Sequence, residues 1–161
     1  MNDKLRVLVA CQDKEKGISL QSIIAGNKNV KKVKLETTGI DTIKNIKSWF
    51  PDIIFVDMNI EDFTGLEIIQ HIRLKFIDYN KPIFILLVDK FEKGIIEISK
   101  DFKFYLDKYE GHPYSVSDMI NSYIDNYGDG KYVEKDYVED IEEVDILIKL
   151  FNWIKNKFKR C

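Results

Sequence analysis

One carboxylate stands where a buried strand is expected to end. The uninterrupted apolar run Ile53–Val56 leads directly into Asp57, and a polar loop then leads to Gly65. After this glycine, apolar residues recur at helical spacing: Leu66, Ile69, Ile72 and Phe76. In open α/β sheets, sites form in the crevice outside the carboxyl ends of the strands, so Asp57 lies where chemistry is usually placed. The plainer interpretation is a turn residue in water, because aspartate is common in turns.

Alternating strands and helices must position this carboxylate. Apolar runs typical of strands lie at Leu5–Ala10, Val30–Leu35, Ile53–Val56, Ile83–Val88 and Phe104–Leu106. Each run is followed by apolar residues at helical spacing, the last set being Val116, Met119, Ile120 and Tyr123. Five alternations of strand and helix predict an α/β fold, with one parallel sheet, right-handed crossovers and helices on both faces.

The stretch that contains Asp57 resembles the phosphoacceptor segment of bacterial two-component response-regulator receiver domains, the CheY-like family. Asp57, Asn59 and Gly65 stand at matching positions, whereas the family's proline is replaced by Glu61. The resemblance covers residues 3–126 and is strongest with the receivers of sporulation regulators. It implies a flavodoxin-like, five-stranded parallel sheet in the order 2-1-3-4-5, with the crevice between the first and third strands.

The metal-binding positions that the resemblance implies differ in this chain. Receivers place two adjacent acids after the first strand, and these hold magnesium together with the phosphoacceptor aspartate. The degenerate acidic-pair positions here are Cys11 and Gln12. Asp13 lies one residue later, and a single-residue gap would restore it as a ligand. The resemblance therefore implies no magnesium site, or a weak one formed by Asp57, Asn59 and Asp13.

The switch positions that the resemblance implies differ only in part. The threonine or serine after the fourth strand of receivers is Leu87 here, whereas Lys108 matches the family's lysine and Tyr105 its aromatic switch residue. Each position has a plainer interpretation. Leu87 and Cys11 suit packing, Lys108 suits a solvated strand end, and Tyr105 suits cover for the sheet edge.

Charge counting favours a pocket without metal. An ordinary receiver pocket holds three carboxylates and one ammonium, and a bound Mg²⁺ neutralises the surplus. Here one carboxylate, Asp57, is expected to face one ammonium, Lys108. Partly screened opposite charges roughly 4 Å apart attract by about 4 kcal/mol at an effective dielectric of 20, so we expect a direct ion pair. The loss of metal ligands, together with Leu87 in place of a hydroxyl, predicts impaired or absent phosphorylation of Asp57.

The last part of the chain predicts a separate amphipathic helix. Residues 127–136 form a polar linker after the receiver-like domain, residues 1–126. Within residues 137–160, apolar residues recur at steps of three and four: Tyr137, Ile141, Val144, Leu147, Phe151, Ile154 and Phe158. Acidic residues fill the start and basic residues the end, which suits the helix dipole. We expect this helix to cover its own receiver, to form a homodimer or to bind a partner; its acidic half argues against a membrane surface.

Length, charge and cysteine content narrow the possible classes of function further. A length of 161 residues suits one domain, and a net charge of -2 gives no global attraction to nucleic acid or membranes. The roughly 35 residues after the receiver are too few for a helix-turn-helix module, so no DNA binding is expected. Without a secretory signal or a long apolar run, the expected location is the cytoplasm. Cys11 and Cys161 lack zinc or disulfide spacing and are expected to be reduced thiols.

These patterns favour a signalling protein over an enzyme, since no glycine-rich phosphate loop and no pair of nucleophile and base is present. The leading hypothesis is an atypical response regulator, a pseudo-receiver, in phosphorelay-type signal transduction. It would act through protein contacts, and a histidine kinase or a phosphotransfer protein is the implied partner. The alternatives are a conventional phosphoacceptor receiver that depends on magnesium, and a structural adaptor that dimerises through residues 137–160.

Overall fold

A computed structural model describes residues 4–76, 82–109, 113–140 and 143–159. It has five strands: β1 (Leu5–Ala10), β2 (Val30–Glu36), β3 (Ile53–Asp57), β4 (Ile83–Val88) and β5 (Tyr105–Lys108). Its described helices are α1 (Lys14–Ala25), α2 (Gly39–Trp49), α3 (Gly65–Lys75), α4 (Lys93–Phe102), α5 (Pro113–Asp125) and α6 (Glu143–Phe158). The strands form one parallel sheet in the order β2-β1-β3-β4-β5, which confirms the flavodoxin-like α/β fold expected from the sequence.

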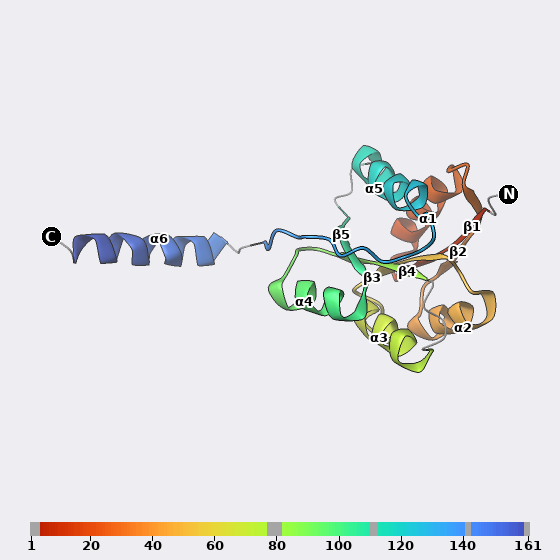
Figure 1. Ribbon diagram of the computed structural model, residues 1–161, viewed down its shortest axis with the longest axis horizontal. Coiled ribbons are helices and arrows are strands. Elements are labelled where there is room, and N and C mark those ends of the chain that lie inside the picture. The colour runs from red at the N-terminus through yellow and green to blue at the C-terminus, as the bar shows by residue number, and fades with distance from the viewer. Residues whose placement is uncertain (1–3, 77–81, 110–112, 141–142, 160–161) are drawn as a thin grey trace.

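Helices cover both faces of the sheet (Figure 1). One core packs α1 and α5 against one face and includes Leu20, Ile120 and Phe55. The other core packs α2, α3 and α4 against the opposite face and includes Ile46 and Ile69. Every residue of β3 and β4 is buried, as the uninterrupted apolar runs of a strand covered on both sides require.

The loop after β3 is tightly constrained. The Met58 N–H donates to the Leu87 carbonyl, and the Gly65 N–H donates to the Met58 carbonyl, at 3.0 and 2.9 Å. Thr64 then caps α3 in a capping box with Glu67. These bonds fix the polar loop between the end of β3 and the start of α3, so the backbone that carries Asp57 is held on both sides.

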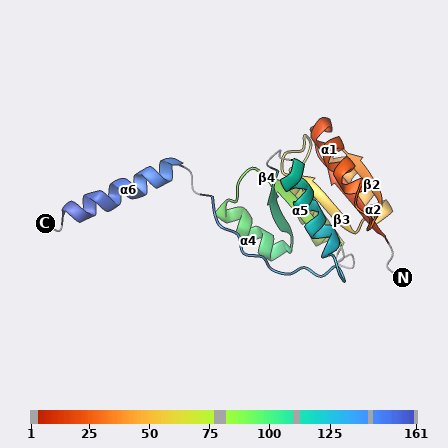
Figure 2. The ribbon, with the colours of Figure 1, turned by 90° about the horizontal axis from the view of Figure 1, so that it is seen from above.

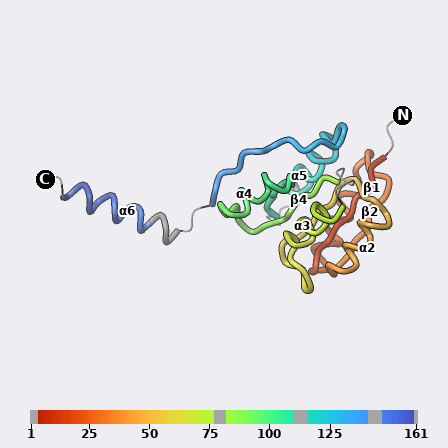
Figure 3. The backbone as a smooth tube through the Cα atoms, turned by 60° about the horizontal axis from the view of Figure 1, so that its bottom comes forward, coloured from red at the N-terminus to blue at the C-terminus, as the bar shows by residue number. Residues whose placement is uncertain are grey.

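The segment after α5 is an extended strap, residues 128–140, which Figure 3 shows running past α4. Hydrogen bonds attach it to β5 and to the loop before α4. Tyr137 of the strap packs against Phe91 with ring centroids 5.1 Å apart, and its hydroxyl accepts from the Leu106 N–H at 2.9 Å. The Val133 N–H donates to the Tyr105 hydroxyl at 3.0 Å. Most of the expected polar linker is therefore attached to the domain.

The C-terminal helix begins later than its periodicity predicts. It starts at Glu143 rather than at Tyr137, because the Tyr137 side chain is engaged by the domain. Ile141, Arg160 and Cys161, which the sequence assigned to the tail, lie outside the described residues. Figure 1 shows α6 projecting away from the sheet. Within the described ranges, the structure holds no helix with the length and apolar character needed to cross a membrane.

Candidate functional site

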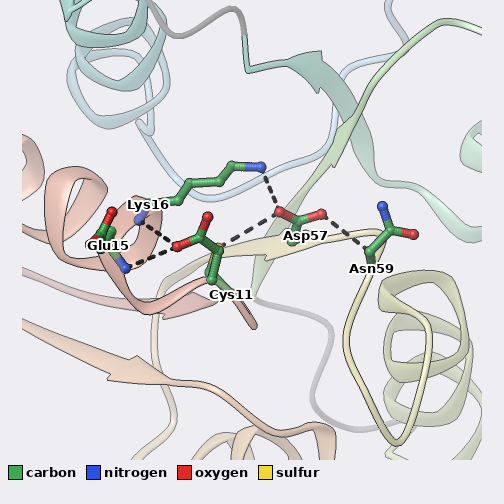
Figure 4. Close-up of polar contacts among 6 residues, drawn as sticks. Cys11, Glu15, Lys16, Asp57 and Asn59 are labelled. Atoms are coloured by element: carbon green, nitrogen blue, oxygen red, sulfur yellow. Dashed lines mark hydrogen bonds and ion pairs between the residues drawn. The ribbon is translucent and has the colours of Figure 1, made fainter.

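Asp57 is the last residue of β3 and lies at the carboxyl end of the sheet, next to the end of β1 (Figure 4). Only 8% of the residue is exposed. Its carboxylate therefore needs hydrogen-bonding partners or a compensating charge, since a buried, unpaired anion is costly. Both are present.

The compensating charge is Lys16. Its Nζ atom lies 2.5 Å from Asp57 Oδ2, and both side chains are mostly buried. The Asn59 N–H donates to the other carboxylate oxygen, Oδ1, at 3.1 Å. Figure 4 shows the Lys16 side chain reaching across to Asp57 from the first turn of α1. The Lys16 ammonium also lies over the Tyr109 ring, 4.6 Å from its centroid, a cation–π arrangement that holds the cation in place.

The expected ion pair between Asp57 and Lys108 is wrong. Lys108 Nζ instead lies 2.5 Å from Asp140 Oδ2 in the strap and 4.6 Å from the centroid of the Phe91 ring. Lys108 ends β5, which is separated from β3 by β4, whereas α1 begins directly above the junction of β1 and β3. Sequence reasoning missed Lys16. The available signal was a lysine in the first helical turn after the first strand, at the switch point of the predicted topology.

The three positions after β1 do not provide a metal-binding acid pair. Cys11 is fully buried, and its thiol donates to Asp57 Oδ2 at 3.7 Å. Burial, reinforced by the nearby Asp57 charge, raises the pKa of the Cys11 thiol to about 11, so this side chain is a neutral thiol near pH 7. Gln12 is exposed. Asp13 caps α1 by accepting from the backbone N–H groups of Glu15 and Lys16.

This donor set does not fit Mg²⁺ well. Magnesium prefers an octahedron of hard oxygen ligands, usually one or two carboxylates with water and phosphate. Asp57 Oδ2 is bonded to Lys16, Asp13 Oδ1 is used by the helix cap, and the neutral sulfur of Cys11 is no magnesium ligand. Within the described ranges, no group of three or more histidine, cysteine, aspartate or glutamate residues could hold a metal ion.

The two switch positions are both engaged in packing. Leu87 is opposite Asp57 in the register of β3 and β4 and is only 2% exposed, so it offers an apolar wall and no hydroxyl. Tyr105 packs against Tyr123 and Tyr132 with centroids 5.5 and 5.1 Å away, and its hydroxyl accepts from Val133 of the strap. Both Tyr105 and Lys108 therefore contact the strap.

A cleft of about 330 Å³ opens beside the site. It is lined by residues of the loops after β3 and β4 and of the start of α4: Met58, Asn59, Leu87, Val88, Asp89, Lys90, Glu92 and Ile95. Two of its lining residues are neighbours of Asp57: Asn59, whose N–H donates to the carboxylate, and Leu87, which pairs with Asp57 across β3 and β4. Its rim carries two acids, Asp89 and Glu92, and one base, Lys90, whose Nζ atom lies 4.0 Å from Glu92 Oε1.

Solved structures that align with this chain include receiver domains of response regulators. The response regulator domain of Thermotoga maritima CheB aligns with a TM-score of 0.64 and 18% identity, over 76% of this chain and 94% of that chain. The phosphorylated cyanobacterial phytochrome response regulator RcpA aligns with a TM-score of 0.66 and 12% identity, over 78% and 96%. A CheY-like receiver domain protein from Methanospirillum hungatei aligns with a TM-score of 0.64 and 15% identity, over 76% and 94%.

The chain therefore has the fold of the CheY-like response-regulator receiver domains. No protein-family model matches the sequence, and no curated protein matches it significantly. At these identities the likeness concerns the fold, and the particular pairing of Asp57 with Lys16 is a property of this chain.

Proposed function

We propose that this protein is an atypical receiver in phosphorelay-type signal transduction, in which Asp57 accepts a phosphoryl group poorly or not at all and the output is protein contact. The observation that carries the proposal is the ion pair between Asp57 and Lys16. Phosphoryl transfer to Asp57 would require this pair to open. It would also require the charge on the transferring group to be cancelled without a second acid to recruit magnesium.

The charge balance supports this reading. Asp57 and Lys16 together are neutral, and their charged atoms are in direct contact, where Coulomb attraction amounts to several kcal/mol at an effective dielectric of about 20. Lys108, the cation that the family resemblance assigns to the pocket, is bonded to Asp140. A conventional receiver needs both a free carboxylate and that lysine, so two separate ion pairs would have to rearrange before catalysis.

The test is incubation with a small phosphodonor, such as acetyl phosphate, and excess MgCl₂, read by intact mass. We expect little or no gain of a phosphoryl group by the wild-type protein. Near-stoichiometric gain that Asp57→Asn abolishes would refute the proposal and support the alternative of a conventional receiver that depends on magnesium.

A pair of variants tests whether the positive charge of Lys16 weakens magnesium binding at Asp57. Lys16→Met leaves Asp57 without its cation, and adding Gln12→Asp places an acid at the exposed position next to Cys11. We expect the double variant to bind magnesium more tightly than the wild type, as measured by shifts of the Asn59 amide signal during a MgCl₂ titration. Lys14→Met combined with Gln12→Asp is the matched control, because Lys14 is exposed and has no ion pair within the described ranges. Equal magnesium responses of the double variant and the control would show that Lys16 does not set the affinity.

The partner in this proposal is a protein. Receivers exchange phosphoryl groups with histidine kinases or phosphotransfer proteins, and such a partner would meet the loops at the carboxyl end of the sheet. A catalytic activity of its own is no part of the proposal.

A further inference from the structure

The apolar face of α6 has no cover within the described ranges. Its large side chains are exposed by 39% to 73%: Leu147, Ile148, Leu150, Phe151, Trp153, Ile154 and Phe158. Five of these residues line one apolar groove along the helix. Figure 1 and Figure 2 show the helix standing clear of the sheet and of the other helices. Contiguous exposed apolar surface of this kind marks an interaction site in soluble proteins.

The spacing of the apolar residues fits pairing with another helix. Leu147, Phe151, Ile154 and Phe158 follow one another at steps of four, three and four, the spacing of a coiled-coil seam. Leu150 broadens this seam on one side and Ile148 on the other. At 16 residues and about 24 Å, α6 is short for an isolated helix in water, so burial of the seam is what would stabilise it.

The charges favour a second copy of the same helix, in the opposite direction. Acidic residues open α6, by sequence Glu143 and Asp145, whereas lysines close it: Lys155, Lys157 and Lys159. In a parallel pair, the lysine-rich ends would lie side by side. In an antiparallel pair, the acidic start of each helix meets the basic end of the other, and the two helix dipoles also oppose each other.

The seam is compatible with such a two-fold arrangement. With the axis between Phe151 and Ile154, Phe151 of one helix faces Ile154 of the other, and Leu147 faces Phe158. Each contact then occurs twice, and the pair closes without leaving a surface for a third copy. An anionic membrane surface fits less well, because it would repel the acidic start of the helix.

We propose that α6 pairs antiparallel with α6 of a second copy and thereby makes this protein a homodimer. The proposal goes beyond the Asp57 site and does not depend on whether Asp57 accepts a phosphoryl group. It assigns the C-terminal helix to assembly and leaves the carboxyl end of each sheet accessible.

The experiment is sedimentation equilibrium of the full chain in reducing buffer. We expect a dimer, and we expect Phe151→Glu to raise its dissociation constant by about tenfold or more, because it places a charge in the centre of the seam. Asn156→Glu is the matched control: it introduces the same charge on the polar face and should leave the dimer intact. A wild-type monomer at all concentrations would overturn the proposal, as would equal effects of the two variants.

A second variant decides the direction of the helices and does not depend on whether Phe151→Glu keeps α6 folded. Lys159→Glu puts an acid beside Asp145 at the acidic start of an antiparallel partner and should weaken the dimer. In a parallel dimer, the same change relieves repulsion between lysines and should tighten it, which would refute the antiparallel pair. Flotation with vesicles rich in phosphatidylserine tests whether an anionic membrane surface, rather than a second copy, covers the apolar face of α6. Vesicle binding by a protein that stays monomeric in solution would overturn the proposal in favour of a membrane surface.

Discussion

The hydroxyl of Tyr137 gives a sharp test of how the strap is attached. This oxygen accepts from the Leu106 N–H on β5 at 2.9 Å, across 31 residues of sequence. Tyr137→Phe removes the acceptor and keeps the ring that packs against Phe91. Tyr132→Phe is the matched control, because the Tyr132 hydroxyl is buried and has no hydrogen-bond partner within the described ranges.

The expected change in hydrogen exchange follows from the loss of one hydrogen bond in Tyr137→Phe and of none in Tyr132→Phe. An intramolecular hydrogen bond contributes about 0.5–1.5 kcal/mol net, and its loss leaves the Leu106 N–H without a protein acceptor. If the strap opens locally, that free energy corresponds to exchange of the Leu106 amide hydrogen that is roughly two- to twelvefold faster in Tyr137→Phe. Tyr132→Phe should be neutral or slightly stabilising, since it removes a hydroxyl that is buried without a partner.

Hydrogen exchange followed residue by residue by NMR measures both effects in the full chain. The Val56 amide, in the buried strand β3, serves as the internal reference for global unfolding. Acceleration confined to Leu106 and its neighbours in Tyr137→Phe would support the strap as a locally attached segment. Unchanged Leu106 exchange in Tyr137→Phe, or equal acceleration in Tyr132→Phe, would refute the assigned hydrogen bond.

Three further outcomes are expected. Gly65→Ala should lower the melting temperature by roughly 2–12 °C, because the added methyl would overlap the Asp57 carbonyl oxygen, whereas Gly94→Ala, with open space around it, should not lower it. Cys11, whose pKa burial raises to about 11, should resist iodoacetamide near pH 8 in the native protein and react after unfolding in urea, as read by mass. A hydrogen bond from Lys108 lowers the pKa of Asp140 in the folded protein. The ionised Asp140 carboxylate therefore contributes fully to stability above its ordinary pKa of 3.8, and this contribution is lost as the pH falls through the lower folded value. Asp140→Asn should remove this pH dependence from acid unfolding curves.

The fold followed from local patterns in the sequence. Uninterrupted apolar runs such as Ile53–Val56 can be buried only in a sheet covered on both faces, and five strand and helix alternations leave few topologies. The resemblance to receivers supplied the strand order, which the structure confirms. The last strand was assigned as Phe104–Leu106, whereas β5 is Tyr105–Lys108, because pairing with β4 extends it beyond the apolar residues.

The partner of Asp57 could not be read from spacing. Two lysines, Lys16 and Lys108, end near the same edge of the sheet, and sequence alone does not say which ammonium reaches the carboxylate. Lys108 is instead paired with Asp140, a residue far along the chain whose proximity to Lys108 the sequence does not reveal. The predicted first residue of α6 was wrong for a similar reason. Tyr137 has the right period for the helix, but a contact with the domain overrides periodicity.

The strap also protects the edge of the sheet that β5 forms. β5 is an edge strand, and an edge strand exposes main-chain donors to which a foreign strand can add. On β5, the Tyr137 hydroxyl accepts the hydrogen bond of the Leu106 N–H and so occupies this donor. The Tyr137 hydroxyl therefore adds to the protection that β5 already has from its length of only four residues and from its charged residues Asp107 and Lys108. Loss of this contact would leave one more main-chain donor of the edge strand open to pairing with a foreign strand.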